Sequence, residues 1–182
     1  MKNLIWAEWK KLRRSSIVLF TVIATILIAA FVLFAGQCVT IEGYYLNDPG
    51  WYMTMVQPWA TLFVLPAIIA MLGSYMICRE EQDDTLKSLL LIPLNETAMT
   101  SAKMIVTFVL SVLIYLLLFV ITLSTELILH YSDLSIGMVL SFFKSYLLEG
   151  VGVFLAVSPI IALVSYTKKS YWLALLLAEI YS

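Results

Sequence analysis

The chain has 182 residues, of which 62% are hydrophobic and only 13% are charged, and its formal net charge is -1. This charged fraction is about half that of a typical soluble domain, so the chain has too little charge to cover a water-facing surface. The composition therefore excludes an ordinary soluble domain and predicts an all-α polytopic membrane protein. We expect its environment to be the lipid bilayer, with no nucleic-acid partner.

Residues 1–14 have an amphipathic pattern. On a helix, apolar side chains spaced i, i+4, i+7 share one face, with a tryptophan beside them and basic residues on the far side. The face comprises Ile5, Trp6, Trp9 and Leu12. We expect a helix in the cytoplasmic interface of the membrane, with its tryptophans among the lipid headgroups. The alternative is a basic flank that only orients the first span.

Five stretches are poor enough in charge to be transmembrane segments. A hydrocarbon core about 30 Å thick needs roughly 20 apolar residues. The expected spans are residues 15–36, 58–78, 104–126, 142–167 and 170–182. The fifth reaches only about 20 Å at 1.5 Å per residue, so we expect a C-terminally truncated part of a six-span helical bundle. Since no repeat or linker marks a second unit, residues 1–182 are expected to form a single domain.

The basic residues predict the orientation. They precede the first span and lie between spans two and three and between spans four and five, whereas residues 37–57 and 129–137 contain no Lys or Arg. Because cytoplasmic loops are enriched in Lys and Arg, the N-terminus is predicted to be cytoplasmic.

The cytoplasmic connection after the second span begins with an acidic run. Its members are Glu80, Glu81, Asp83 and Asp84. Attraction to anionic lipid would favour basic residues at this position, so the run indicates a protein partner. Either aspartate can cap a short helix that starts at Thr85, and an i, i+3, i+4 apolar stripe follows, made of Leu86, Leu89 and Leu90. The alternative is a solvated loop.

Glu149 is the charged residue expected to lie deepest in a span. With a helix start near residue 142, it would be about 10 Å into the membrane. A carboxylate near the bilayer centre costs about 2.5 to 3.5 kcal/mol and usually faces a bundle interior or water. We expect either a role in a translocation path or an interfacial or bundle-facing carboxylate. Lys144, five residues earlier, is expected to extend toward the interface.

No catalytic or metal site is expected. The chain lacks the Gly-x-x-x-x-Gly-Lys loop that holds nucleotide phosphates, and His130 is its single histidine. An intramembrane enzyme is the least favoured class, because paired polar residues are missing from the spans.

Two segments support a family resemblance. The opening NLIWAEWKKLRRS is similar to the pattern L..AEW.KL.RS, and REEQDDTLKSLLLIPL, followed by Lys103, is similar to RE....T.K.LL.LP.SR.....K. Both patterns belong to the permease subunits of type-2 ABC exporters, and the chain resembles in particular the compact six-span bacterial subunits of lantibiotic and bacitracin immunity. Asn95 and Glu96 depart from the family, which usually has Ser and Arg there.

The resemblance implies a permease subunit in the bacterial plasma membrane that exports a peptide antibiotic or another amphipathic compound for self-protection. A separate cytoplasmic ATPase would bind ATP and magnesium and grip residues 79–93 as a coupling helix, and this chain would bind no cofactor. A second permease chain, identical or paralogous, would complete the path. The alternative function is a non-transporting accessory or sensor membrane protein that acts through the same loop.

Overall fold

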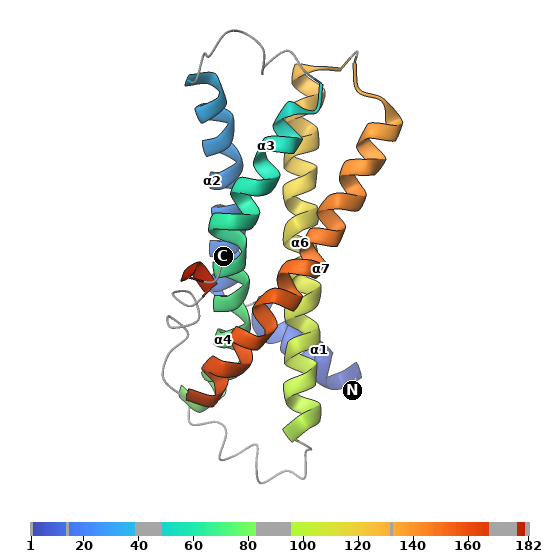
Figure 1. The fold of residues 1–182 in the computed structure, drawn as a ribbon. Coiled ribbons are helices and arrows are strands. Elements are labelled where there is room, and N and C mark those ends of the chain that lie inside the picture. The colour runs from blue at the N-terminus through green and yellow to red at the C-terminus, as the bar shows by residue number, and fades with distance from the viewer. Residues whose placement is uncertain are drawn as a thin grey trace.

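The structure is a computed structural model that describes residues 2–13, 15–38, 49–82, 96–131, 133–167 and 178–180. These residues form helices, with no strand among them, which confirms the predicted all-α class. The main elements are α1 (Lys2–Arg13), α2 (Ser16–Cys38), α3 (Trp51–Trp59), the π-helical turn η1 (Ala60–Val64), α4 (Leu65–Gln82), α6 (Glu96–Leu129) and α7 (Ile136–Thr167). The long helices run along one another in an elongated bundle, and α1 crosses it near the end where α6 begins (Figure 1).

Within the described residues, three apolar segments are long enough to cross a membrane. They are Ser16–Gly36, Thr97–Leu129 and Ile136–Leu163, and a fourth crossing can be formed by Trp51–Leu62 with Leu65–Ile77, which are bent by 46°. Four of the expected spans correspond to these segments, and most of the fifth lies outside the described residues. Helices α3, α6 and α7 also begin earlier than expected, because helical hydrogen bonding continues beyond the most apolar part of each crossing.

Two prolines flank the bend in the second crossing. Pro58 lies inside α3, and Pro66 is the second residue of α4. Proline has no backbone N–H to donate to the preceding turn, and π-helical turns commonly accompany such interruptions. The π-helical turn η1 lies between these two prolines, and it re-aims the residues between the two halves of the crossing.

Close packing joins α6 to α7 halfway along the bundle. A Cβ atom on Gly150 would lie 3.1 Å from the Cα atom of Val112, so a larger residue would fit only if α6 moved slightly away. At the same crossing, the Ser111 hydroxyl donates a hydrogen bond of 2.7 Å to the Gly150 carbonyl oxygen. Small residues commonly allow membrane helices to approach in this way. The contact holds α7 against the bundle next to Glu149.

Buried tyrosines connect α3 to its neighbours. The Tyr52 hydroxyl donates to the Ala29 carbonyl oxygen of α2 at 2.7 Å, and the Tyr146 hydroxyl of α7 donates to the Met53 carbonyl oxygen at 2.9 Å. In an apolar environment each hydroxyl needs such a partner. These bonds hold the first half of the bent crossing between α2 and α7.

Candidate functional site

Glu149 lies near the middle of its membrane segment. It is the fourteenth residue of Ile136–Leu163, which has 28 residues. Because α7 starts at Ile136, Glu149 is about 20 Å along the helix from its first residue at 1.5 Å per residue. The helix therefore begins six residues before the start near Phe142 that the sequence suggested, and the depth of Glu149 in the membrane stays a prediction.

Three neutral side chains surround the Glu149 carboxylate. Gln57 Nε2 donates to Oε1 at 2.5 Å, and the Thr61 hydroxyl donates to Oε2 at 3.2 Å. The Tyr115 hydroxyl donates in turn to Thr61 Oγ1 at 3.2 Å. We call Gln57, Thr61, Tyr115 and Glu149 the Glu149 cluster. Its members come from α3, η1, α6 and α7, so it exists only when these three crossings are assembled.

The local structure explains why these side chains meet. Gln57 and Thr61 are four residues apart, so they lie on one helical face and both reach the same carboxylate. Thr61 belongs to the π-helical turn, which is a common feature of functional sites in helices. The close approach of α6 and α7 at Gly150 brings Tyr115 into the same layer.

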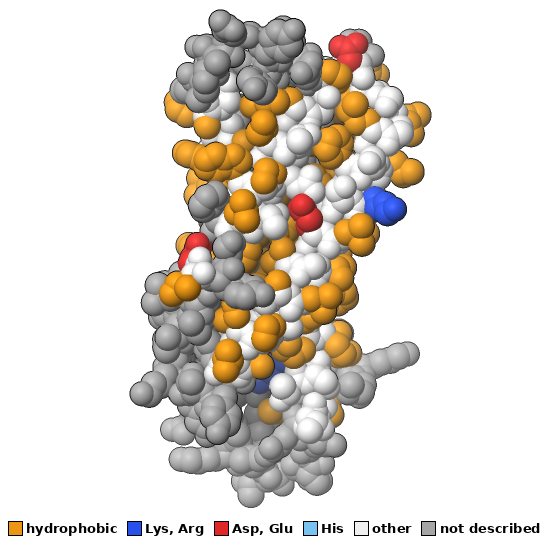
Figure 2. Space-filling view, in the orientation of Figure 1, with side chains coloured by type: hydrophobic (Ala, Val, Ile, Leu, Met, Phe, Trp, Pro, Cys, Tyr) orange, Lys and Arg blue, Asp and Glu red, His pale blue; other side chains and the backbone are white. Residues whose placement is uncertain are grey.

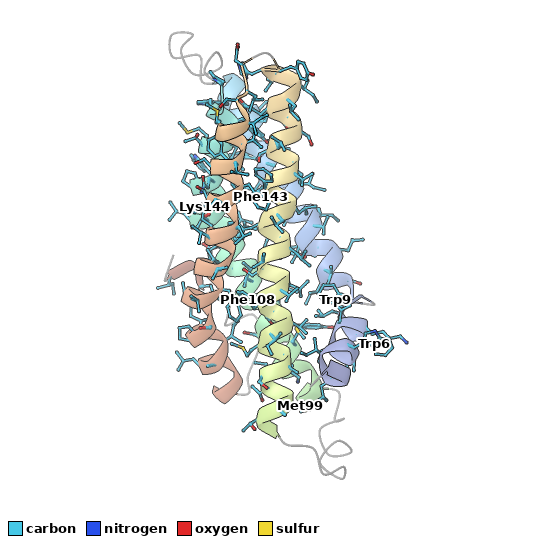
Figure 3. The ribbon with its side chains drawn as sticks, turned by 90° about the vertical axis from the view of Figure 1, so that its right-hand side faces the viewer. Trp6, Trp9, Met99, Phe108, Phe143 and Lys144 are labelled. Carbon is cyan, nitrogen blue, oxygen red and sulfur yellow. The ribbon has the colours of Figure 1, made fainter. Side chains whose placement is uncertain are left out.

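The Glu149 cluster contains no positive charge. Among the described residues, Glu149 bonds only to the amide and hydroxyl donors named above. Lys144 is exposed and lies on the side of α7 away from α6 (Figure 3). It precedes Glu149 by five positions, so the two side chains point about 140° apart around the helix. Acidic residues within spans usually mark substrate or ion paths or proton relays.

A second buried carboxylate, Glu126, was not identified from the sequence. It is 0% exposed, and its Oε1 atom accepts the Gly50 backbone N–H at 2.6 Å and lies 3.1 Å from His130 Nδ1. Its Oε2 atom has no hydrogen-bond partner among the described residues. Gly50 is the N-cap residue of α3, with a φ of 88°, and it has no side chain with which to cap the helix. Glu126 therefore caps α3 from another helix, and only its i, i+4 spacing from His130 signals a role in the sequence.

An apolar cavity of about 270 Å³ lies between α2 and α3. Its walls include Phe31, Trp51, Met55 and Trp59. The surface drawn in Figure 2 is likewise mostly hydrophobic, with few charged side chains among the described residues. The cavity can hold apolar groups but offers no charged group for chemistry.

Comparison with known proteins identifies the family. Residues 4–182 match the family described as ABC-2 family transporter protein. The chain belongs to the ABC-2 family of transporter proteins. It is also 30% identical over 94 residues to the bacitracin transport permease protein BCRB of Bacillus licheniformis, a match that covers 52% of this chain and 45% of the relative. The chain thus matches about half the length of that relative, and no solved structure matches it.

These matches confirm the resemblance to type-2 ABC permeases that the two segments indicated. The long apolar helices agree with this family, and the ABC-2 chain is an integral membrane protein.

Among the described residues, no group of three or more His, Cys, Asp or Glu side chains could hold a metal ion.

The N-terminal segment of the ABC-2 chain forms the expected helix, but its apolar residues divide between two sides. Leu12 is buried at 4% exposure and Ile5 packs against the core. Trp6 is 65% exposed and Trp9 is 39% exposed, and Figure 3 shows Trp6 on the side of α1 away from the bundle. The two tryptophans are thus free to contact headgroups, and the interfacial position of α1 stays a prediction.

Most of the predicted coupling segment lies outside the described residues. This holds for Asp83, Asp84, Thr85, Leu86, Leu89 and Leu90. Glu80 and Glu81 belong to the last turn of α4, and the structure does not describe their side chains. The end of α4 and the start of α6 lie at the same end of the bundle as α1 (Figure 1). The coupling helix therefore stays a prediction.

Proposed function

We propose that this chain is the transmembrane permease subunit of an ABC exporter in the bacterial plasma membrane, with its N-terminus in the cytoplasm. The observation that carries the proposal is the family match over residues 4–182, and the membrane-crossing helices support it. The sequence has no phosphate-binding loop of the Gly-x-x-x-x-Gly-Lys type. ATP and magnesium would therefore be bound by a separate cytoplasmic ATPase subunit, and this chain would not catalyse hydrolysis.

The partner ATPase would contact the connection between α4 and α6. The acidic residues at the end of α4 would orient it, and the leucine stripe would enter a cleft on its surface. The N-terminal helix α1 supports this arrangement, since it lies at the same end of the bundle. A second permease chain, identical or paralogous, would complete the translocation path.

The proposed cargo is a peptide antibiotic or another amphipathic compound, and its export would protect the producing or exposed cell. The similarity to a bacitracin transport permease supports this class. The Glu149 cluster supports it as well, because a polar site at mid-membrane depth can receive a molecule with both polar and apolar parts.

Replacing two leucines of the stripe tests the proposal. We expect Leu86→Ala with Leu89→Ala to leave the permease in the membrane but to remove the ATPase during affinity purification. Loss of a buried anchor typically costs about 2 kcal/mol or more, roughly 30-fold in affinity. Export-dependent resistance, measured as the inhibitory concentration of bacitracin, should fall to that of cells lacking the permease.

A matched control uses exposed apolar residues at the other end of α6. Ile128→Ala with Leu129→Ala removes similar side chains, which are 85% and 45% exposed, and should retain both the ATPase and the resistance. Unchanged ATPase binding and resistance in the Leu86 and Leu89 variant would contradict the coupling role. That result would favour the accessory or sensor function instead.

A further inference from the structure

The Glu149 carboxylate accepts hydrogen bonds on both oxygens. Gln57 donates to Oε1, and Thr61 donates to Oε2 while it accepts from Tyr115. An ionised carboxylate only accepts hydrogen bonds, whereas a protonated one donates from one oxygen. The bonds from Gln57 and Thr61 favour the ionised form of the carboxylate, which partial burial by itself disfavours. The two oxygens also have about four acceptor positions, so two remain for a ligand.

This negative charge lacks a counter-charge among the described residues. Gln57 and Thr61, which bond to Glu149, are both neutral, and the nearest basic residue on α7, Lys144, lies on a different side of the helix. Charges at mid-membrane depth usually pair with an opposite charge. A positive group from outside the described residues would complete the site.

Open space adjoins the carboxylate. Gly152 follows Glu149 by three residues, so the two share a helical face. A Cβ atom on Gly152 would have no heavy atom within 4 Å, in contrast to Gly150, where the same atom would meet the α6 backbone. Glu149 itself is partly exposed, and the exposed residues Leu148 and Leu155, which lie on the same side of α7 as Gly152, are apolar. A ligand with a positive group and an apolar body fits these surroundings.

We propose that the Glu149 cluster binds the positively charged group of an amphipathic compound within the membrane, with the apolar part of the compound against α7 near Gly152. The proposal rests on the exporter function and names the substrate class. The amide of Gln57 and the hydroxyls of Thr61 and Tyr115 hold the carboxylate in place, and the charge of Glu149 selects cations over anions of the same shape.

Two probes of nearly equal size and opposite charge test whether the Glu149 cluster selects cations over anions. Tetraphenylphosphonium is a lipophilic cation, and tetraphenylborate is its anionic counterpart. Equilibrium binding is measured on the full chain in lipid nanodiscs, with empty nanodiscs as background and without an ATPase. We expect the wild-type chain to bind the cation above background and to bind the anion more weakly.

Neutralising the Glu149 carboxylate should remove the preference for the cation over the anion. Glu149→Gln keeps the shape of the side chain and its bonds to Thr61, and we expect it to weaken binding of the cation by more than about tenfold without weakening binding of the anion. Asp133→Asn, which removes the same charge from an exposed turn, should leave both affinities unchanged. Equal affinity of the cation for the wild-type chain and Glu149→Gln would overturn the proposal, as would absence of cation binding to the wild-type chain.

A second variant tests the position of the ligand without changing charge. Gly152→Leu fills the open space beside the carboxylate, so we expect it to weaken binding of the cation by about tenfold or more. Unchanged affinity would place the ligand elsewhere and overturn the proposal. Because binding is measured without transport, failure of the ATPase experiment leaves this result intact, and failure here leaves the exporter proposal standing.

Discussion

Glu126 has no exposed surface, and its position explains how α3 begins. The first backbone N–H groups of a helix lack partners within the helix and need a cap. Gly50, which is buried, receives this cap from Glu126 through a bond of 2.6 Å, although the two residues are 76 positions apart. A cap supplied by another helix links the start of α3 to α6, so it stabilises tertiary structure as well as the helix.

We expect Glu126→Ala to lower the free energy of unfolding by about 1 to 3 kcal/mol, because it leaves the buried Gly50 N–H without an acceptor. Glu126→Gln keeps an oxygen acceptor and should cost less. The midpoint of thermal unfolding of the purified chain in detergent ranks the stability of the two variants against that of the wild type. The exposed Asp133→Ala is the control and should not change the midpoint. A midpoint of Glu126→Ala equal to that of the wild type would show that the cap has no energetic importance.

At the scale of the element, two glycines on one helix have opposite environments. Gly150 faces the α6 backbone, with 3.1 Å between its hypothetical Cβ atom and Val112 Cα, whereas Gly152 faces open space. Both lie inside α7, so any change in helix propensity is nearly the same at the two positions. A difference between equal substitutions at these positions therefore reports packing.

We expect Gly150→Leu to destabilise the chain by about 1 to 3 kcal/mol through overpacking against α6. Gly152→Leu, the matched variant, should leave stability unchanged or slightly raised. The midpoint of unfolding in detergent compares the two. Equal midpoints would mean that α6 and α7 do not pack at Gly150 as described.

Over the whole molecule, successive crossings alternate in direction. The end of α2 and the start of α3 lie at one end of the bundle, whereas the ends of α4 and α7 lie at the other (Figure 1). The distribution of Lys and Arg predicts that the α1 end lies in the cytoplasm.

Cysteine labelling in intact cells tests the orientation, in a background where Cys38 and Cys78 are replaced by serine. We expect a cysteine in place of Lys87 to be protected from a membrane-impermeant maleimide and a cysteine in place of Ser132 to react. After permeabilisation both should react, which shows that each position can be labelled. Reaction of Lys87→Cys in intact cells would reverse the proposed topology.

The sequence by itself was sufficient to predict an all-α membrane protein, the approximate crossings and the family. Apolar length is a local property of the chain, since every backbone polar group must be bonded within the helix when it crosses lipid. The prediction of the family likewise depended on local features, namely the opening segment and residues 79–103. The predicted starts of α3, α6 and α7 were less accurate, because helices continue beyond the residues that need to be apolar.

Only the tertiary structure decided what surrounds the buried carboxylates. Gln57 lies 92 positions from Glu149, and Gly50 lies 76 positions from Glu126, so no local period relates them. Their contacts depend on the bend at η1 and on the close approach of α6 and α7 at Gly150. Helix periodicity determines which face a side chain occupies, but the packing of one helix against another determines which distant residue meets that face.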